Sequence, residues 1–338
     1  MVKNKYKDYH IIKRDGIGDF FIFLLSSRDS GVDFNNSRFV FHTNAVTHEF
    51  VRLLLPLART SNDFSFSIVA RSESVAILPT YTDIFGAGSK RLGYALSKNI
   101  YSMGQFVHKN PLKRVLNAFA RIGIKRHIVK DKTEYDRYIS FINFLLKEKI
   151  LDAKAITDDL KSENSEKNLR RIAIFPGASE CDKRWHYKKF ILTASKLQHF
   201  AEVNIILGPS EEHLEDAVLM SALKYGCKIN MHICPSAHAL VDLLQNSSLV
   251  ISNDSMAIHL AAYLGVPGIC TAWGVRQDRF LGHLTNHNII IVSECCHFLP
   301  CERCILVGDE RLKCIKNIKV ENVVELAECI MERDEVNA

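Results

Sequence analysis

Apolar and polar residues alternate along the second half of the chain in a regular strand and helix pattern. Short apolar runs predict strands at 171–177, 203–209, 228–234, 249–254 and 268–274. Between them, apolar residues at helical spacing predict helices at 188–199, 211–225, 237–244 and 256–264. Short apolar strands that alternate with such helices form a parallel sheet covered on both faces, so this half is expected to be a Rossmann-like unit.

The first half begins with the same alternation and then loses it. Strands are expected near 9–13, 39–42 and 66–70, and helices from about Asp19 and across 47–57 and 133–149. Residues 85–130 are basic and interrupted by glycine and serine, which indicates loops and an irregular helix. The polar stretch 156–171 is the expected linker between domains 1–160 and 161–338, and the C-terminal helix is expected to pack back as a closing element, toward the first domain as one alternative.

Composition places the chain among ordinary globular proteins. Its 338 residues exceed what one hydrophobic core usually organises, and 47% hydrophobic with 24% charged residues argue against a disordered or fibrous chain. No apolar run reaches the roughly 18 to 20 residues of a membrane span, and the first residues lack the apolar middle of a signal peptide. We therefore expect a cytoplasmic protein, with peripheral binding to the inner membrane as an alternative.

Charge is unevenly distributed. Residues 1–165 carry a net charge of +9 and residues 166–338 a net charge of −3. A basic first half favours anionic partners, such as phosphorylated sugars or lipid head groups, although a solvated surface explains it equally well. Basic helices and basic ribbons interleaved with aromatic residues are missing from the sequence, so nucleic acid is not expected as a partner.

Four predicted strands end in small polar residues. These ends are Asp15 to Asp19, Pro176 to Ser179, Gly208 to Glu212 and Asn253 to Ser255. Ligands of doubly wound sheets bind outside the carboxyl ends of the strands, where glycines let the backbone approach and helix starts attract anions such as a diphosphate. Turns need the same residue types, but four such ends together with His259 favour a binding site.

The common nucleotide motifs do not match. The segment DGIGDF has Phe20 where a dinucleotide fingerprint needs its third glycine, and the P-loop pattern is missing from the sequence. A dehydrogenase and a P-loop enzyme are therefore not supported.

Four segments together resemble one known family in order and spacing. RDGIGDFFIFL, FPGASECDKRWHYKKF, LGPSEEHLEDA and SNDSMAIHLAAYLGVPGICTAWG are similar to glycosyltransferase family 9, the heptosyltransferases of lipopolysaccharide core synthesis. The resemblance covers most of residues 165–330 and the first 25 or so residues. It implies an α/β protein of GT-B architecture: two Rossmann-like domains with parallel sheets facing across a cleft, the acceptor on the first domain and the nucleotide-sugar on the second.

The resemblance also implies an inverting, metal-independent transfer. Asp19 matches the family's aspartate and would act as general base on the acceptor hydroxyl, although an aspartate there can instead cap the helix. Lys183 matches the lysine that would neutralise the leaving diphosphate. Arg184 would assist, or would be a solvated loop charge, and Trp185 is expected to pack rather than stack on a ligand.

The remaining donor-site residues follow from the same resemblance. Asp254, Ser255 and His259 match a pattern in which a helix N-terminus holds the diphosphate and the nearby ribose; Asp254, being negative, would orient donor hydroxyls or cap the helix. Glu211 would bind the ribose or base edge, or be a first-turn helix carboxylate. The expected donor site is completed by Gly18, Ser179, Met256 and Ala257. Met256 stands where the family usually has glycine, and we expect it to narrow or reshape the donor pocket.

Five cysteines gather between residues 295 and 314. The C-x-x-C pair Cys301 and Cys304, with Cys296 and Cys314, predicts a structural zinc site, and free thiols or an occasional disulfide are the alternative. No cofactor is expected for catalysis.

Three functions remain from the sequence. The first is transfer of a sugar, heptose from ADP-heptose, to a lipopolysaccharide core or related anionic, lipid-linked glycan. The alternatives are a sugar-nucleotide epimerase or hydrolase on the same scaffold, and a non-catalytic nucleotide-sugar-binding protein.

Overall fold

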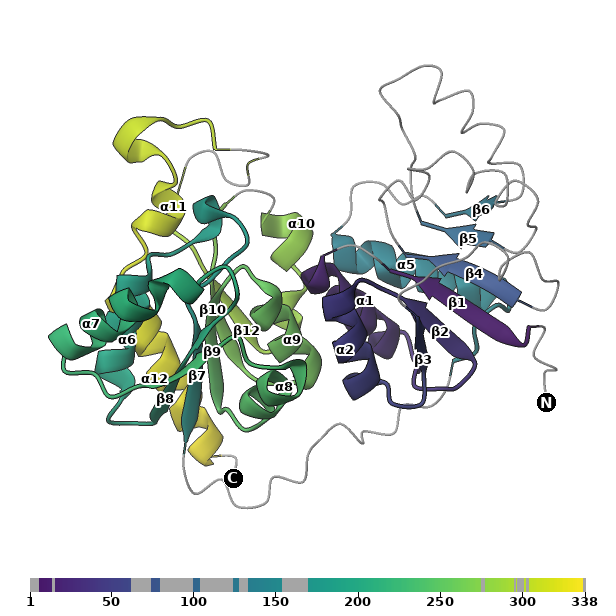
Figure 1. Cartoon of the computed structure of the whole chain (residues 1–338). Helices are drawn as coiled ribbons and strands as arrows, with labels where there is room; N and C mark the ends of the chain where they lie inside the picture. Colours follow the sequence, from purple (N-terminus) through teal and green to yellow (C-terminus); the bar gives the residue numbers. More distant parts are fainter. Residues whose placement is uncertain are drawn as a thin grey trace. The chain divides into compact units, whose positions relative to one another are not determined.

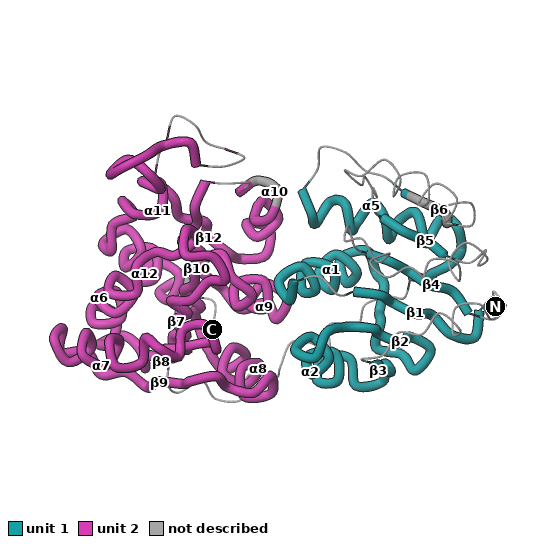
Figure 2. Tube along the Cα trace, turned by 45° about the horizontal axis from the view of Figure 1, so that its top comes forward, with its two compact units in different colours: residues 1–157 teal, residues 158–338 magenta. Residues whose placement is uncertain are grey.

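The computed structural model (Figure 1) divides the chain into two compact units, Met1–Thr157 and Asp158–Ala338, which Figure 2 colours separately. The sequence pattern puts this boundary after residue 160. No helix in the described part of the chain is long and apolar enough to cross a membrane. The structure describes residues 6–13, 16–61, 74–79, 100–103, 124–127, 133–153, 170–274, 277–294, 296, 301 and 304–336.

The described residues of unit 1 form a six-stranded parallel sheet in the order β3-β2-β1-β4-β5-β6. The strands are β1 (Asp8–Ile12), β2 (Phe39–His42), β3 (Arg59–Ser61), β4 (Ser74–Leu78), β5 (Ile100–Ser102) and β6 (Ile124–Arg126). The helices described in this unit are α1 (Ile17–Asp29), α2 (Ala45–Leu54) and α5 (Glu134–Lys147).

The sequence pattern located only part of this unit. The expected strand at 39–42 has the bounds of β2, and the expected helix at 133–149 matches α5 to within two residues. The expected strand at 66–70 lies outside the described residues. Strands β5 and β6 fall within 85–130, where loops and an irregular helix were predicted; that prediction was wrong at these strands, because three residues are too few to show an alternating pattern.

Helix α1 is buried along most of its length, from Phe20 to Ser27, and it packs on α5 and α2. The rings of Phe23 on α1 and Tyr138 on α5 lie 5.6 Å apart. Because α1 follows directly on β1, its first turn, with Asp19, begins at the carboxyl edge of the sheet.

Unit 2 also contains a six-stranded parallel sheet, in the order β12-β11-β10-β7-β8-β9. Its strands are β7 (Arg171–Phe175), β8 (Glu202–Leu207), β9 (Asn230–Ile233), β10 (Leu249–Asn253), β11 (Gly268–Thr271) and β12 (Ile289–Val292). Its longer helices are α6 (Tyr187–Leu197), α7 (Glu215–Lys224), α8 (Ala237–Gln245), α9 (Met256–Leu264) and α12 (Val320–Val336). The predicted alternation of strands and helices is confirmed here, and β12 is the strand that it missed.

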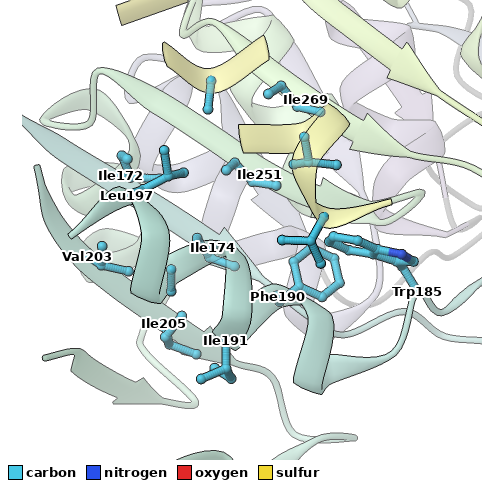
Figure 3. Packing of buried hydrophobic residues seen from close by; sticks show 14 of the residues in the cluster. Ile172, Ile174, Trp185, Phe190, Ile191, Leu197, Val203, Ile205, Ile251 and Ile269 are labelled. Atoms are coloured by element: carbon cyan, nitrogen blue, oxygen red, sulfur yellow. The ribbon is translucent and has the colours of Figure 1, made fainter. Parts of the chain in front are cut away.

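Helices cover both faces of this sheet, with α6, α7 and α12 on one side and α8 and α9 on the other (Figure 1). On the first side, apolar residues of the strands and of all three helices form one core cluster. Figure 3 shows Ile174 of β7 near Phe190 and Ile205 of β8 near Ile191, both on α6, and Ile172 of β7 beside Leu197 of the same helix. The sequence left open whether the C-terminal helix turns toward the first unit; α12 contacts α6, β10 and β11 of unit 2.

The strand order of each sheet reverses at one place. In unit 1 the strands that follow β1 in the chain extend the sheet on one side, and the strands that follow its neighbour β4 extend it on the other. In unit 2 the same holds for the neighbours β7 and β10. The loops that follow such neighbouring strands diverge, and the crevice between them is where doubly wound sheets bind ligands. In unit 2 this point is flanked by the loops after Phe175 and after Asn253.

Candidate functional site

Lys183 lies at the carboxyl edge of the unit 2 sheet, in a short 3₁₀ helix (Cys181–Lys183) that follows β7. Its Nζ is 3.1 Å from Oδ2 of Asp254 and 3.9 Å from Oε1 of Glu180. The same ammonium lies 5.8 Å from the centre of the Trp273 ring. The loop after β7 therefore holds a cation against the end of β10, across the point where the strand order reverses.

Asp254 directly follows β10 and is 8% exposed. Burial alone would raise the pKa of its carboxyl group, but His259 and the charge of Lys183 outweigh burial and leave that pKa lowered. The helix that follows is capped by Ser255, so the expected alternative that Asp254 caps it is wrong. Asp254 is instead the anionic partner of Lys183.

Ser255 is the N-cap of α9, and its Oγ accepts a hydrogen bond from the N–H of Ala257. Ser252 Oγ lies 2.9 Å from Ser255 Oγ and fixes the cap to the end of β10. Met256 occupies the first position of α9 and is partly buried, while Ala257 is buried. The first N–H groups of a helix have no partner within it and carry partial positive charge, so this turn can bind an anion.

His259 lies one turn into α9 and is 5% exposed. Its Nε2 is 3.8 Å from Oδ1 of Asp254, and its Nδ1 has no hydrogen-bond partner among the described residues. The ring of His283 stacks on it at 5.8 Å, and burial, helped by the charges of His259 and His287, lowers the pKa of His283 to about 2. His283 is therefore neutral at physiological pH, and no sequence signal pointed to it.

Arg184 pairs with a carboxylate on the side of β7 opposite to the carboxylate that Lys183 contacts. Its Nη2 is 3.1 Å from Oε1 of Glu211, and its Nε and Nη2 donate to the carbonyl oxygen of Ala178 at 2.9 and 2.7 Å. Glu211 follows β8 and is buried. Burial raises the pKa of its carboxyl group, although Arg184 opposes that shift. Arg184 is therefore not a solvated loop charge, and that alternative was wrong. Glu211 is the N-cap residue of the short 3₁₀ helix Glu212–Leu214, and its side chain makes no capping hydrogen bond. Both expectations for Glu211, ribose or base contact and a carboxylate at a helix start, stay predictions.

Two glycines make room for Glu211. A Cβ atom at Gly177 would lie 2.5 Å from Cδ of Glu211, and one at Gly208 would lie 3.1 Å from its Oε2. Ser179, two residues beyond Gly177, is exposed in the same loop. The close approach thus explains the glycines at these strand ends without any ligand.

Asn253 is fully buried. The sequence pattern put it at the end of a strand but did not indicate it as a site residue. Its Oδ1 accepts hydrogen bonds from the Trp185 N–H and the Thr271 hydroxyl, and its Nδ2 donates to the carbonyl oxygen of Pro176. A polar residue at the end of an otherwise apolar strand was the available signal. Asn253 ties the ends of three neighbouring strands into one rigid edge.

Trp185 packs in the core, as predicted. It is completely buried, lies 4.8 Å from the ring of Phe190, and donates its indole N–H to the carbonyl oxygen of Ile318. The fully buried ring anchors the segment that begins with Lys183 and Arg184.

In unit 1, Asp19 does not cap α1. The N-cap is Gly16 and makes no side-chain capping bond, so the expected capping alternative was wrong. Asp19 is partly buried in the first turn, and no hydrogen bond or ion pair to its side chain is found within the described ranges. Gly18 precedes it on the same turn. The parts of Asp19 and Gly18 in catalysis and donor binding stay predictions.

The cysteines that were expected to bind zinc lie partly together. Burial, and then the neighbouring Cys314, Cys304 and Cys296, raise the pKa of the Cys301 thiol. The sulfur of Cys314 accepts a hydrogen bond from the N–H of Gly274. Among the residues that the structure describes, no three His, Cys, Asp or Glu side chains are arranged to hold a metal ion. Zinc binding by these four cysteines stays a prediction.

Taken together, the carboxyl edge of the unit 2 sheet presents a paired cation and a helix N-terminus beside the point where the strand order reverses. Lysine and helix N-termini both stabilise phosphate groups. The arrangement suits a phosphorylated ligand better than a neutral one.

The chain is similar to a known family in sequence and to known proteins in structure. The family model described as glycosyltransferase family 9 (heptosyltransferase) matches residues 121–304. No curated protein sequence matches. The glycosyltransferase of family 9 from Veillonella parvula DSM 2008 is similar in structure, with 14% identity, a TM-score of 0.66, and 98% of this chain and 99% of that chain covered.

Two Escherichia coli structures are also similar. Heptosyltransferase WaaC with ADP has 15% identity and a TM-score of 0.64, with 96% of this chain and 99% of that chain covered. ADP-heptose lipopolysaccharide heptosyltransferase II has 13% identity and a TM-score of 0.60, with 97% and 99% covered. The two parallel-sheet units thus have the GT-B fold of the heptosyltransferases, and the family model covers more than half of the sequence. The chain belongs to glycosyltransferase family 9.

Proposed function

We propose that the chain is an inverting glycosyltransferase that moves heptose from ADP-heptose to a hydroxyl group of a lipopolysaccharide core or related glycan. The observation that carries the proposal is the pairing of Lys183 with Asp254 beside the Ser255-capped start of α9. These groups stand where a doubly wound sheet binds its ligand. Membership of the family and the likeness to a heptosyltransferase solved with ADP support a donor that carries this nucleotide.

The donor's diphosphate is assigned to unit 2. Lys183 would contact its phosphate oxygens, and the N–H of Met256, at the first position of α9, would bind them from the helix end, where the N–H of Ala257 is already donated to Ser255 Oγ. Ser179 lies exposed at the same edge and would add a hydroxyl donor. Asp254 and His259 would hold Lys183 in place and reach the hydroxyl groups of the donor.

The reaction assigned to these groups is a single displacement. The acceptor oxygen forms a bond to the anomeric carbon on the face opposite the diphosphate, and the bond from that carbon to the diphosphate oxygen breaks with its electron pair. Asp19 accepts the proton of the acceptor hydroxyl as the bond forms. The Lys183 ammonium and the α9 N–H groups would stabilise the negative charge that develops on the departing ADP. No metal ion takes part in this scheme.

The acceptor is assigned to unit 1. The net charge of +9 on residues 1–165 supports an anionic acceptor, such as a phosphorylated or lipid-linked glycan. A lipid-linked acceptor would bring the protein to the cytoplasmic face of the inner membrane during turnover.

A direct assay separates the proposed transfer from its alternatives. The protein is incubated with ADP-heptose, with and without a lipopolysaccharide core acceptor, and the products are identified by mass spectrometry. Transfer predicts a glycosylated acceptor and ADP in equal amounts. Conversion of the donor without acceptor would instead support an epimerase or hydrolase, and no conversion in either mixture would support a binding protein.

The Asp19→Asn variant tests the assigned base. Loss of a general base lowers the rate by about 10²- to 10⁴-fold. ADP binding should be retained, because the variant leaves unit 2 unchanged. An unaltered rate of transfer in the Asp19→Asn enzyme would show that Asp19 is not the general base.

A further inference from the structure

We propose that Glu180 is a displaceable counter-ion of Lys183, which the diphosphate of the donor replaces when it binds and which returns to the ammonium when ADP leaves. The inference deepens the proposed function and rests on it for the identity of the ligand. Three features of the structure support it: the unequal burial of the two carboxylates at Lys183, the contacts of Glu180, and the balance of charge around the ammonium.

Lys183 has two anionic partners that differ in burial. Oδ2 of Asp254 lies 3.1 Å from Nζ and that side chain is 9% exposed, whereas Oε1 of Glu180 lies 3.9 Å from the same Nζ and its side chain is 61% exposed. Asp254 is also held from its other side, because its Oδ1 lies 3.8 Å from Nε2 of His259. Asp254 is therefore the permanent partner of Lys183, and Glu180 is the partner that can leave.

The carboxylate of Glu180 has Lys183 as its one partner in the described part of the chain. At 3.9 Å the two groups attract through charge without a hydrogen bond. Glu180 stands at the N-cap of the 3₁₀ helix Cys181–Lys183, and its side chain makes no capping hydrogen bond. Because exposed ion pairs contribute little to stability, the side chain can move into solvent at small cost.

The local charge favours such an exchange. One ammonium faces two carboxylates, and a diphosphate would bring further negative charge to the same group. A carboxylate that stayed in place would repel the phosphate oxygens, which corresponds to about threefold to tenfold in affinity for exposed groups at this range. The other acidic side chain of the loop, Asp182, is paired with Arg311, so its charge is compensated.

Anion binding tests the exchange, because the inference predicts a gain of affinity on mutation. Calorimetry at low salt would compare ADP and inorganic pyrophosphate on the wild type and on Glu180→Gln. Removal of the carboxylate should tighten the binding of both anions about threefold to tenfold, and the gain should shrink at high salt, since the ion pair is exposed. Unchanged or weaker binding of both anions would overturn the inference. Glu325→Gln, which removes the same charge from an exposed position on α12, is the matched control and should change neither affinity.

A second substitution shows whether Glu180 acts through Lys183. In a Lys183→Gln background the gain from Glu180→Gln should disappear, because the ammonium no longer holds the carboxylate beside the ligand. A gain of the same size in both backgrounds would indicate general repulsion and would overturn the inference. The melting temperature of Glu180→Gln without ligand should be nearly that of the wild type, as expected for an exposed pair, so the gain in affinity has no structural cause.

Pyrophosphate separates this inference from the proposed function. If Glu180→Gln tightens pyrophosphate binding while neither ADP nor ADP-heptose binds, the proposed donor is wrong and the exchange at Lys183 stands. If the wild type binds ADP-heptose but Glu180→Gln gains no affinity for any of the three ligands, the proposed function stands and the inference fails.

Discussion

The Nζ of Lys183 lies 3.1 Å from a carboxylate oxygen of Asp254, although three strands (β8, β9 and β10), three α-helices and a short 3₁₀ helix separate the two residues along the chain. The neighbouring Arg184 pairs with Glu211 on the other side of β7. Two consecutive cations thus fix the loop after β7 to both of its neighbouring strands. A cation held in this way needs little rearrangement when a phosphate arrives, and such preorganisation strengthens binding.

Removal of the Lys183 charge should affect both stability and binding. In Lys183→Gln the buried Asp254 carboxylate loses its ionic partner, which we expect to cost on the order of 2 kcal/mol in the free energy of unfolding, measured with urea. The affinity for ADP, measured by calorimetry, should fall by about 10- to 100-fold. The exposed Lys188→Gln is the matched control and should change neither quantity.

A second substitution separates the two effects. Adding Asp254→Asn to Lys183→Gln removes the unpaired charge and should restore most of the stability, while ADP binding stays weak. Restored ADP binding in this double variant would show that Lys183 does not contact the ligand.

Asn253→Leu should destabilise unit 2 by about 3 kcal/mol, because the buried Trp185 N–H and the Pro176 carbonyl group would both lose their hydrogen-bond partner. Urea unfolding of the whole chain, followed by tryptophan fluorescence, measures this loss. The exposed Asn246 also makes side-chain hydrogen bonds, and Asn246→Leu serves as the comparison with a small expected effect. Equal losses at the two positions would contradict the role of Asn253 in tying the strand ends together.

The sequence predicted unit 2 far better than unit 1, and strand length is one reason, although the five-residue strand β4 was also not predicted. Strands β8 (EVNIIL) and β10 (LVISN) have six and five mostly apolar residues bounded by turn residues. Strands β3, β5 and β6 have three residues each, too few to show a period. Strand order was also beyond the sequence, since it depends on pairing between distant segments.

The sequence predicted residues of the candidate site but not the contacts between them. The motifs pointed to Lys183, Arg184, Glu211 and Asp254 one at a time, each as a group that would face the ligand. That Lys183 pairs with Asp254 and Arg184 with Glu211 follows only from the order of β10, β7 and β8 in the sheet. His283 was missed because its contact with His259 joins segments with no common motif.

The stability of unit 1 should fall as the pH is lowered through about 6.5, the ordinary pKa of histidine. His10 and His42 are buried with Nδ1 and Nε2 2.9 Å apart. Burial lowers the pKa of His10, which Asp8 opposes and Arg59 assists. The unfolded chain therefore binds more protons than the folded chain just below pH 6.5, and protons favour unfolding.

Thermal unfolding at pH 8, 6 and 5 tests this dependence. Replacement of His10 by Gln should reduce the loss of stability between pH 8 and 5, whereas replacement of the exposed His238 should not. An unchanged pH dependence in His10→Gln would assign the effect to other groups.

Cys301 and Cys314 should react as free thiols. Burial raises the pKa values of Cys301 and Cys314, so their reaction with a thiol reagent should be slow at neutral pH and faster as the pH rises. Elemental analysis of the purified protein, with the reagent applied before and after a chelator, tests the structural zinc. One zinc per chain, with thiols released only by the chelator, would establish the metal site in place of free thiols.

A crystal structure of the chain with ADP tests the central claim most directly. The account predicts the diphosphate between the Lys183 ammonium and the first N–H groups of α9, at the edge where β7 and β10 end. A diphosphate bound elsewhere, away from the Lys183 ammonium and with the start of α9 empty, would contradict it.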